Sequence, residues 1–305
     1  MAGTLVKGDL FPRSLSKDLL QRVKGKSSLA KLSTAEPLEF NGTDIFQFSL
    51  DKEVDIVAEG GQKSSGGATI EPVSMVPIKF EYSMRVSDEF MRASAEAKIP
   101  YLQRFNEAFA KKLARGMDIA AMHGYNPRTA SASLVVGSNS FDGKVTNTVT
   151  QAASDNNPNK NVEDAIALVH GAEYDVNGMA MAPAFRSQLA ELTRIDGTPL
   201  FPELGWGAQP DVIRGLAVDT NSTVSFLKTG ETDPVDLAIV GDFQNMFKWG
   251  MASDIIFKVI ETGNPDNDEV LGDLASRNQV LLRAEAYLGW AILDKAAFAR
   301  ILPNA

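Results

Sequence analysis

The chain has 305 residues, of which 44% are hydrophobic and 23% charged, so it can bury a sizeable core and shows no compositional sign of wholesale disorder. It contains no cysteine, which excludes disulfides, thiolate nucleophiles and cysteine-ligated metals. The formal net charge of −9 argues against a protein whose main task is to bind nucleic acid, because affinity for phosphates comes chiefly from clusters of Lys and Arg.

Residues 1–44 are predicted to form an N-terminal arm. A modest helical pattern of Leu15, Leu19, Leu20 and Val23 buries too little apolar surface to fold alone, so we expect the arm to dock on another surface, with a neighbouring subunit as one option. The start of the chain lacks the apolar core of a secretory signal, and no run of about 18 apolar residues occurs. Both observations predict a cytoplasmic protein that does not enter a membrane.

Two segments with a period of two predict an extended β-hairpin over residues 45–86. Every second residue is apolar from 46 to 50 and again from 76 to 86. Between these segments, the Gly- and Ser-rich residues 58–68 predict a flexible tip. Two strands alone are marginal in water, so the hairpin needs a surface to lie on, within the molecule or across a subunit boundary.

A long helix is predicted over residues 100–123. Pro100 suits the first helical position, and apolar residues recur at helical spacing until His123 and Gly124 end the pattern. At 1.5 Å per residue, this helix spans roughly 36 Å, long enough to be the spine of a flat subunit. Its apolar face comprises Tyr101, Phe105, Phe109, Leu113, Met117 and Ala120.

The rest of the chain predicts an α+β fold with an inserted α/β domain. Residues 159–241 alternate between helix and strand patterns, which indicates mixed packing. The segments on either side, 87–158 and 242–305, are expected to form one body. Within it, the apolar patterns at 255–260 and 279–293 predict strands.

Motifs for catalysis, cofactors or metals are incomplete. In residues 137–144 five residues rather than four separate the glycines, and Val145 stands where a phosphate loop needs Ser or Thr. The acidic residues at 266–269 lack the glycine and the final Glu of a calcium loop. His123 and His170 fit structural roles, since a protonated His123 would interact favourably with the helix dipole. The sequence therefore predicts no enzyme, no cofactor and no metal site.

Three basic residues, Lys111, Lys112 and Arg115, lie off the apolar face of the long helix. A solvated or intersubunit surface is the first interpretation. Contact with nucleic acid is the second, because three charges give only weak, salt-sensitive binding. We therefore treat these residues as candidate intersubunit contacts. Phe80 and Tyr82, on a hydrophobic face of the predicted hairpin, are further candidates, with packing inside the subunit as the alternative.

The order of these parts resembles one known family. Four phrases match it in sequence order: VSDEFM, MAPAFRSQLAELTRIDGTPLF, IVGDFQNMFKWG and VLLRAEAYLGWAILDKAAFARI. They resemble the major capsid proteins of tailed bacteriophages (Caudoviricetes) with the HK97-type fold, and the similarity covers most of the chain. The resemblance implies an N-terminal arm, an extended loop (45–86), a peripheral domain with a spine helix (87–158 and 242–305) and an inserted axial domain (159–241).

For function, the resemblance implies a self-assembling icosahedral shell of pentamers and hexamers that encloses double-stranded DNA without sequence-specific binding. The implied location is the virion capsid, made and assembled in the host bacterial cytoplasm. A portal and decoration proteins are implied partners. Scaffolding is expected as a separate polypeptide, because only some 40 residues precede the first strand. Some relatives join a loop-tip Lys to an Asn of a neighbour; Lys63 stands at that place, without an identified Asn.

Three alternatives are compatible with the sequence. An encapsulin-like nanocompartment shares the fold but holds a cargo protein. An α/β enzyme with an unrecognised carboxylate site predicts a compact monomer or small oligomer with a deep polar pocket. A scaffold or adaptor would bind a partner through residues 58–68. The kind of cargo, the oligomeric state and deletion of this loop distinguish these alternatives from a phage shell.

Overall fold

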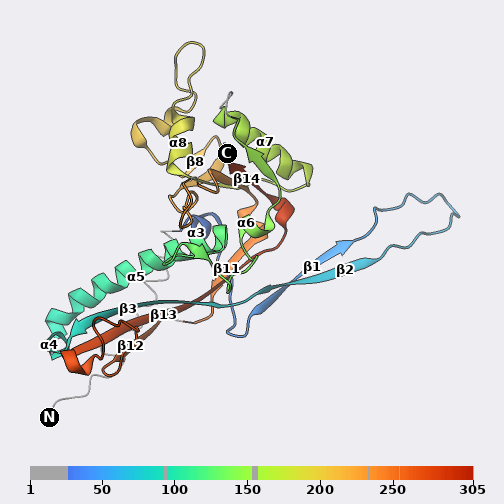
Figure 1. The fold of residues 1–305 in the computed structure, drawn as a ribbon. Coiled ribbons are helices and arrows are strands. Elements are labelled where there is room, and N and C mark those ends of the chain that lie inside the picture. Colours follow the sequence, from blue (N-terminus) through green and yellow to red (C-terminus); the bar gives the residue numbers. More distant parts are fainter. Residues whose placement is uncertain (1–26, 93–94, 153–156, 233, 254, 305) are drawn as a thin grey trace.

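The computed structural model describes residues 27–92, 95–152, 157–232, 234–253 and 255–304. Figure 1 shows a long sheet with helix α5 lying along it, a body around a second sheet that contains the C-terminal strand, and a β-hairpin that projects to the right. The helical pattern predicted for Leu15, Leu19, Leu20 and Val23 lies outside the described residues.

Strand β13 (Gln279–Ile292) forms the centre of the long sheet. It pairs antiparallel with β3 (Ile78–Ser87), and it also pairs with β12 (Ile256–Ile260) and β11 (Phe247–Met251). Most residues of β13 are buried, as expected for a central strand covered by a helix. The two strands predicted near the C-terminal end of the chain are thereby confirmed.

The hairpin is shorter than predicted and has a different second strand. β1 (Thr43–Leu50) pairs antiparallel with β2 (Ala68–Met75), so residues 51–67 form the tip. The strongly alternating segment predicted as the second strand is β3, whose partner is β13. Alternation fixes which side chains share a face but not which strands pair, and the pairing predicted within 45–86 was therefore wrong.

Helix α5 (Ala95–His123) is the predicted spine helix, and it begins five residues earlier than predicted. Pro100 therefore lies within its first two turns, where proline removes one backbone donor. Gly124, with a φ of 70°, ends the helix in the left-handed conformation typical of this position. The 29 residues of α5 span about 44 Å. Neither α5 nor any other described helix is apolar enough over a sufficient length to cross a bilayer.

The second sheet has six strands in the order β6-β14-β10-β7-β9-β8. Their bounds are Thr148–Thr150 (β6), Phe298–Leu302 (β14), Ala238–Gly241 (β10), Gly178–Met181 (β7), Leu216–Thr220 (β9) and Val212–Ile213 (β8). The sheet combines strands of the predicted axial segment with β6 and β14 from the predicted peripheral segments. The division into two domains stays a prediction, and its boundary does not coincide with an edge of this sheet.

Helices and short turns complete the structure. α7 (Pro158–Gly171) begins after Asn157, whose side chain accepts a hydrogen bond from the Lys160 N–H, and α8 (Pro183–Ala190) follows β7 directly. The remaining elements are α3 (Ser28–Leu32), α4 (Asp88–Arg92), α6 (Phe141–Lys144), α9 (Phe243–Met246), η1 (Pro202–Gly207), η2 (Ala275–Arg277), η3 (Lys295–Ala297), β4 (Tyr125–Asn126) and β5 (Ser131–Ala132).

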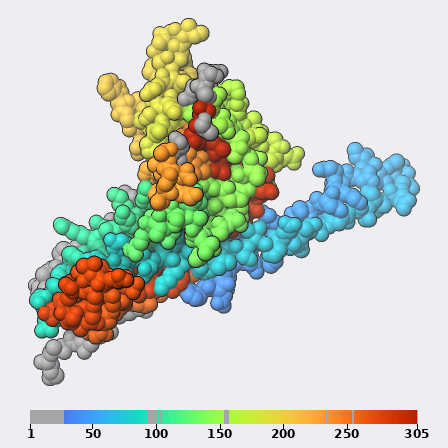
Figure 2. All heavy atoms as spheres, viewed as in Figure 1, coloured from blue at the N-terminus to red at the C-terminus, as the bar shows by residue number. Residues whose placement is uncertain are grey.

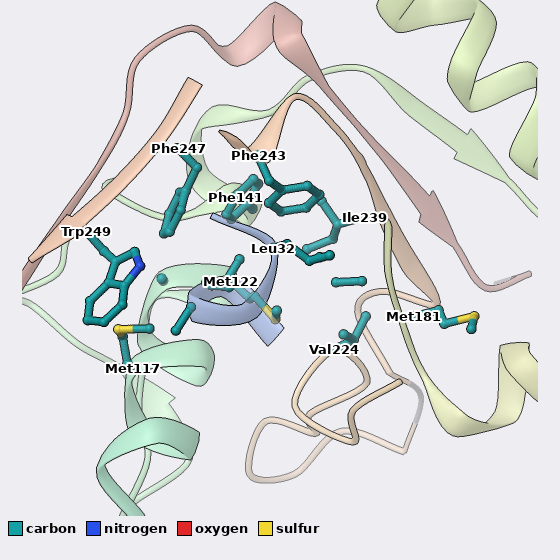
Figure 3. Packing of buried hydrophobic residues seen from close by; sticks show 14 of the residues in the cluster. Leu32, Met117, Met122, Phe141, Met181, Val224, Ile239, Phe243, Phe247 and Trp249 are labelled. Atoms are coloured by element: carbon teal, nitrogen blue, oxygen red, sulfur yellow. The ribbon is translucent and has the colours of Figure 1, made fainter. Parts of the chain in front are cut away.

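The main hydrophobic core lies where α5 meets both sheets. The ring of Phe298 lies 5.0 Å from that of Phe141 and 5.3 Å from that of Phe243, edge to face in both cases. Figure 3 shows Leu32, from the arm, among these side chains close to Met122 of α5. One core therefore joins the arm, the spine helix and the second sheet.

The described end of the arm docks on its own chain. Leu29 and Ala30 are fully buried, and Glu36 donates its N–H to the carbonyl oxygen of Trp249 at 2.7 Å. A helix as short as α3 is stabilised by such burial rather than by its own propensity. A neighbouring subunit was one predicted docking surface; from residue 27 onward the surface is provided by the same chain.

Candidate functional site

The hairpin carries an apolar face that the described residues leave uncovered. Phe46, Phe48 and Leu50 alternate along β1, and Ile70 of β2 lies directly opposite Phe48. These four side chains are 60% to 67% exposed. Figure 2 shows the hairpin standing clear of the body. Contiguous exposed apolar side chains of this kind mark an interaction surface.

The tip of the hairpin combines acidic and apolar side chains. In residues 51–57, DKEVDIV, acidic residues alternate with Lys52, Val54 and Ile56, and both apolar side chains are at least 90% exposed. Lys63 is exposed in the second half of the tip, as predicted. The described residues provide no contact between Lys63 and an asparagine, and the role of Lys63 as an intersubunit contact stays a prediction.

A groove runs between α5 and β3. Phe80 lies against Gly116 of the helix, and the ring of Tyr82 lies 6.3 Å from that of Phe105. Two adjoining hollows of about 310 and 340 Å³ share Tyr82, Phe109 and Lys112 in their walls. Tyr82 is 40% exposed, so the apolar floor of the groove is open to solvent.

Basic side chains line the rim of this groove. They are Arg104, Lys112 and Arg115 of α5, together with Arg128. Arg115 is partly engaged within the chain, because it donates to the Ser222 hydroxyl at 2.9 Å and lies 5.7 Å from the ring centre of Phe226. Within the described part of the chain, Arg104, Lys112 and Arg128 pair with no carboxylate. The rim therefore offers unpaired positive charge beside an apolar floor.

The structure brings four of the six predicted contact residues to this groove: Phe80, Tyr82, Lys112 and Arg115. Lys111 is exposed on α5 but does not line the groove, and Lys63 lies at the hairpin tip. Sequence analysis missed Arg104. It lies eight residues before Lys112, two turns along the same side of the helix, so the helical period could have identified it.

A buried ion cluster joins the end of α5 to the second sheet. Nε2 of His123 donates to the carbonyl oxygen of Thr223 at 2.9 Å, and Nδ1 lies 2.9 Å from a carboxylate oxygen of Asp142. Arg300 lies 2.8 Å from Asp142 and 2.9 Å from Asp236. The sequence assigned His123 a structural role at the helix end, and these partners provide one.

The electrostatics of this cluster favour an ion network over a metal site. Burial and the charge of Asp142 raise the pKa of Asp236 to about 8. Burial lowers the pKa of His123, but the hydrogen bond to Asp142 and the charges of both carboxylates outweigh it and raise that pKa. His123, Asp142 and Asp236 are close enough to hold an ion. Arg300 already supplies positive charge between the carboxylates, and both imidazole nitrogens are engaged, so we interpret the cluster as structural.

Asp118, a buried residue of α5, holds the arm in place. Its carboxylate accepts hydrogen bonds from the N–H groups of Ser28 at 2.9 Å and Leu29 at 3.4 Å, and from the hydroxyls of Ser27 and Thr223. The carboxylate therefore caps the N-terminus of α3 from another helix. Burial raises the pKa of Asp118 to about 6, although these hydrogen bonds favour the ionised form.

The arrangement of these parts occurs in solved structures. A structure from Mycobacterium phage Ogopogo matches with a TM-score of 0.77 at 30% identity, over 91% of this chain and 92% of that chain. A structure from Gordonia phage Cozz matches with a TM-score of 0.72 at 25% identity, over 92% of this chain and 87% of that chain. The fold is the α+β, HK97-type fold of phage capsid proteins, as the sequence predicted.

Sequence comparison gives the family. The model of the phage capsid family matches residues 7–301. The major capsid protein of Staphylococcus phage 80alpha is 28% identical over 296 residues, which cover 93% of this chain and 82% of that protein. The chain belongs to the phage capsid family. It is a structural protein of a phage shell built from many copies, and hence part of the virion; these relatives do not favour the encapsulin-like alternative.

Proposed function

We propose that this chain is the major capsid protein that assembles through pentamers and hexamers into an icosahedral shell around packaged double-stranded DNA. The shell is assembled in the cytoplasm of the bacterial host. One subunit makes the same heterologous contacts with each neighbour, which close first into rings and then into a shell. This role requires no catalytic residue, cofactor or metal, and we expect none.

The projecting hairpin is the observation that carries this proposal. A two-stranded ribbon is marginal in water without further packing. Its exposed face, formed by Phe46, Phe48, Leu50 and Ile70, is stabilised when a second surface covers it, at roughly 25 cal/mol per Å² of buried apolar area. An extension of this kind also enlarges each interface beyond what a compact body can offer.

The groove between α5 and β3 is the surface that we expect to receive the hairpin of a neighbouring copy. Its apolar floor suits Val54 and Ile56, and its basic rim suits the acidic residues of segment 51–57. Complementary charges of this kind set the register of an interface and exclude wrong partners. Lys111 and Lys63 are expected at the margins of the same contact.

The enclosed DNA is expected to be held without sequence-specific contacts. A net charge of −9 limits the affinity of the inner surface for phosphates, which suits a container that must be filled and emptied. A portal, and scaffolding or decoration proteins as separate polypeptides, complete the proposed set of partners.

Expression of the full chain, followed by light scattering and negative-stain microscopy, tests the shell. Closed particles, rings or tubes are expected, and nuclease-resistant DNA is expected in particles isolated from infected cells. A chain that stays monomeric at every concentration and salt, both alone and when coproduced with the other structural proteins of its phage, would contradict the proposal.

A double variant, Phe46→Ser with Phe48→Ser, tests the hairpin separately. It removes two of the four exposed apolar side chains of this face and is expected to leave free subunits. Val270→Ser is the matched control, because Val270 is 82% exposed on a different loop. Shells formed by the double variant would refute the role of the hairpin. Deletion of 58–68 that spares shells but abolishes partner binding would favour the adaptor alternative.

A further inference from the structure

Trp206 is held on the surface by a rigid support. Its side chain is fully exposed, and with a φ of 54° its backbone adopts the left-handed conformation that L residues other than glycine rarely adopt. Arg186 of α8 fixes the chain on both sides, because its guanidinium donates to the carbonyl oxygen of Leu204 at 2.7 Å and to that of Ala208 at 3.0 Å. Because the backbone that carries Trp206 is held in place, burial of its side chain costs less entropy than it would on a mobile loop.

A hollow of matching character lies on the α7 side of the same body. It has a volume of about 170 Å³, and its walls include Val162 and Ile166 of α7, Phe201, and Ile213 of β8. A cavity of about 150 Å³ is large enough for an aromatic ring. Trp206 is not part of its walls, so the hollow is not filled by the indole of the same chain. Leu189 of α8 also lines the hollow, and Trp206 belongs to η1, so the projection and the hollow lie on one subunit, in the body that Figure 1 shows around α7 and α8.

The rim of the hollow adds a specific partner for an indole. Arg214 is exposed, and its guanidinium centre lies 4.4 Å from the ring centre of Phe201. The described residues include no carboxylate paired with Arg214. A guanidinium that stacks on one aromatic ring can be covered by a second ring on its other face, and tryptophan is the side chain that binds cations most strongly in this way.

We infer that Trp206 of one copy inserts into the hollow lined by Val162, Ile166 and Phe201 on the next copy. The inference rests on the proposed assembly into a shell and names one of its contacts. Trp206 and the hollow are different surfaces of the same chain, so the contact is heterologous and repeats from copy to copy. Central, well-packed aromatic anchors of this kind contribute most of the affinity of an interface.

Quenching of tryptophan fluorescence by acrylamide tests this contact. The chain has three tryptophans, and Trp249 and Trp290 are buried in the subunit, so Trp206 dominates quenching in free subunits. Assembly is expected to remove this quenching. Trp206→Ala is expected to raise the concentration needed for assembly about tenfold or more without changing subunit stability. Ile195→Ala is the control, because Ile195 is equally exposed on a neighbouring loop of the same body.

Val162→Phe tests the hollow, because the larger side chain fills it. Trp206 that remains quenchable in assembled particles would overturn the contact while leaving the shell intact. If Trp206 is still protected from acrylamide in assembled Val162→Phe particles, the assignment of the hollow is wrong. A chain that forms no particles under any of the conditions above would instead refute the proposed function, and this contact with it.

Discussion

Replacement of Asp118 by alanine is expected to release the arm from the body of the subunit. The carboxylate caps α3 through the N–H groups of Ser28 and Leu29 and is buried between the arm and α5. Without it, two backbone donors in the first turn of α3 are buried with no acceptor. Because α3 is five residues long, it cannot retain its helical structure once this cap and its burial are lost.

The expected loss in the free energy of unfolding is about 1 kcal/mol at pH 7. Each buried donor left without a partner costs about 1–3 kcal/mol. A second effect offsets part of this cost. The pKa of Asp118 rises from 3.8 to about 6, which means that the folded chain destabilises the ionised carboxylate by about 3 kcal/mol. The raised pKa also means that this group stabilises the fold less as pH rises through about 4 to 6, so the difference between Asp118 and alanine should grow by about 1.4 kcal/mol from pH 7 to pH 5.

Urea unfolding of unassembled subunits measures this difference, and amide hydrogen exchange of α3 reports release of the arm. Asp175→Ala is the matched control, because it removes the same charge from an exposed position. Unchanged protection of α3 in Asp118→Ala would refute the assigned role, as would a difference in stability that shrinks rather than grows at pH 5.

Three further substitutions test other contacts. In the folded chain Asp236 keeps its proton up to about pH 8, whereas in the unfolded chain it loses it near pH 4. The free energy of unfolding therefore falls as pH rises between these values, by up to about 1.4 kcal/mol per pH unit. Asp236→Asn should reduce this fall, measured by urea unfolding above about pH 6.5. Arg300→Met leaves the Asp142 carboxylate and Asp236 buried without the guanidinium that binds both, and should cost about 3–5 kcal/mol in the same assay. Arg92→Met, at an exposed pair, should cost about 1 kcal/mol or less. Gly250→Ala places a Cβ 2.3 Å from the carbonyl oxygen of Glu36, so proteolysis of the arm should accelerate while β11 stays protected; equal protection of the arm would contradict this close approach.

Sequence periodicity predicted the elements of this fold better than their partners. The alternation of apolar side chains identified both strands, although only β13 buries its alternating face completely and Tyr82 of β3 stays exposed. The two strands lie about 200 residues apart and pair through their backbones, and no side-chain pattern encodes that choice. The second strand of the hairpin, β2, was missed because Pro72 and exposed polar residues weaken its alternation.

The side-chain clusters were harder to predict for a related reason. His123, Asp142, Asp236 and Arg300 come from four segments, and His123 alone had a sufficient local explanation at the end of α5. Asp118 carried a usable signal: a carboxylate next to Met117, on the apolar side of a helix, requires hydrogen-bond donors from elsewhere. Ser27 and Ser28, within the predicted arm, supply two of these donors, and the sequence analysis did not consider them.

The direction of the hairpin is set within the subunit, before any neighbour binds. β1 leaves from the docked arm, and only two residues separate the end of β2 from the start of β3, so both strands of the hairpin continue from anchored chain. At its root, Leu38, Met75 and Ala291 form a small buried cluster that joins arm, hairpin and long sheet. The exposed strands beyond this cluster make no comparable contacts with the described body. Residues that hold the arm, such as Asp118 and Gly250, therefore control where the apolar face of the hairpin is presented, and substitutions there should alter assembly although both positions are buried inside one subunit.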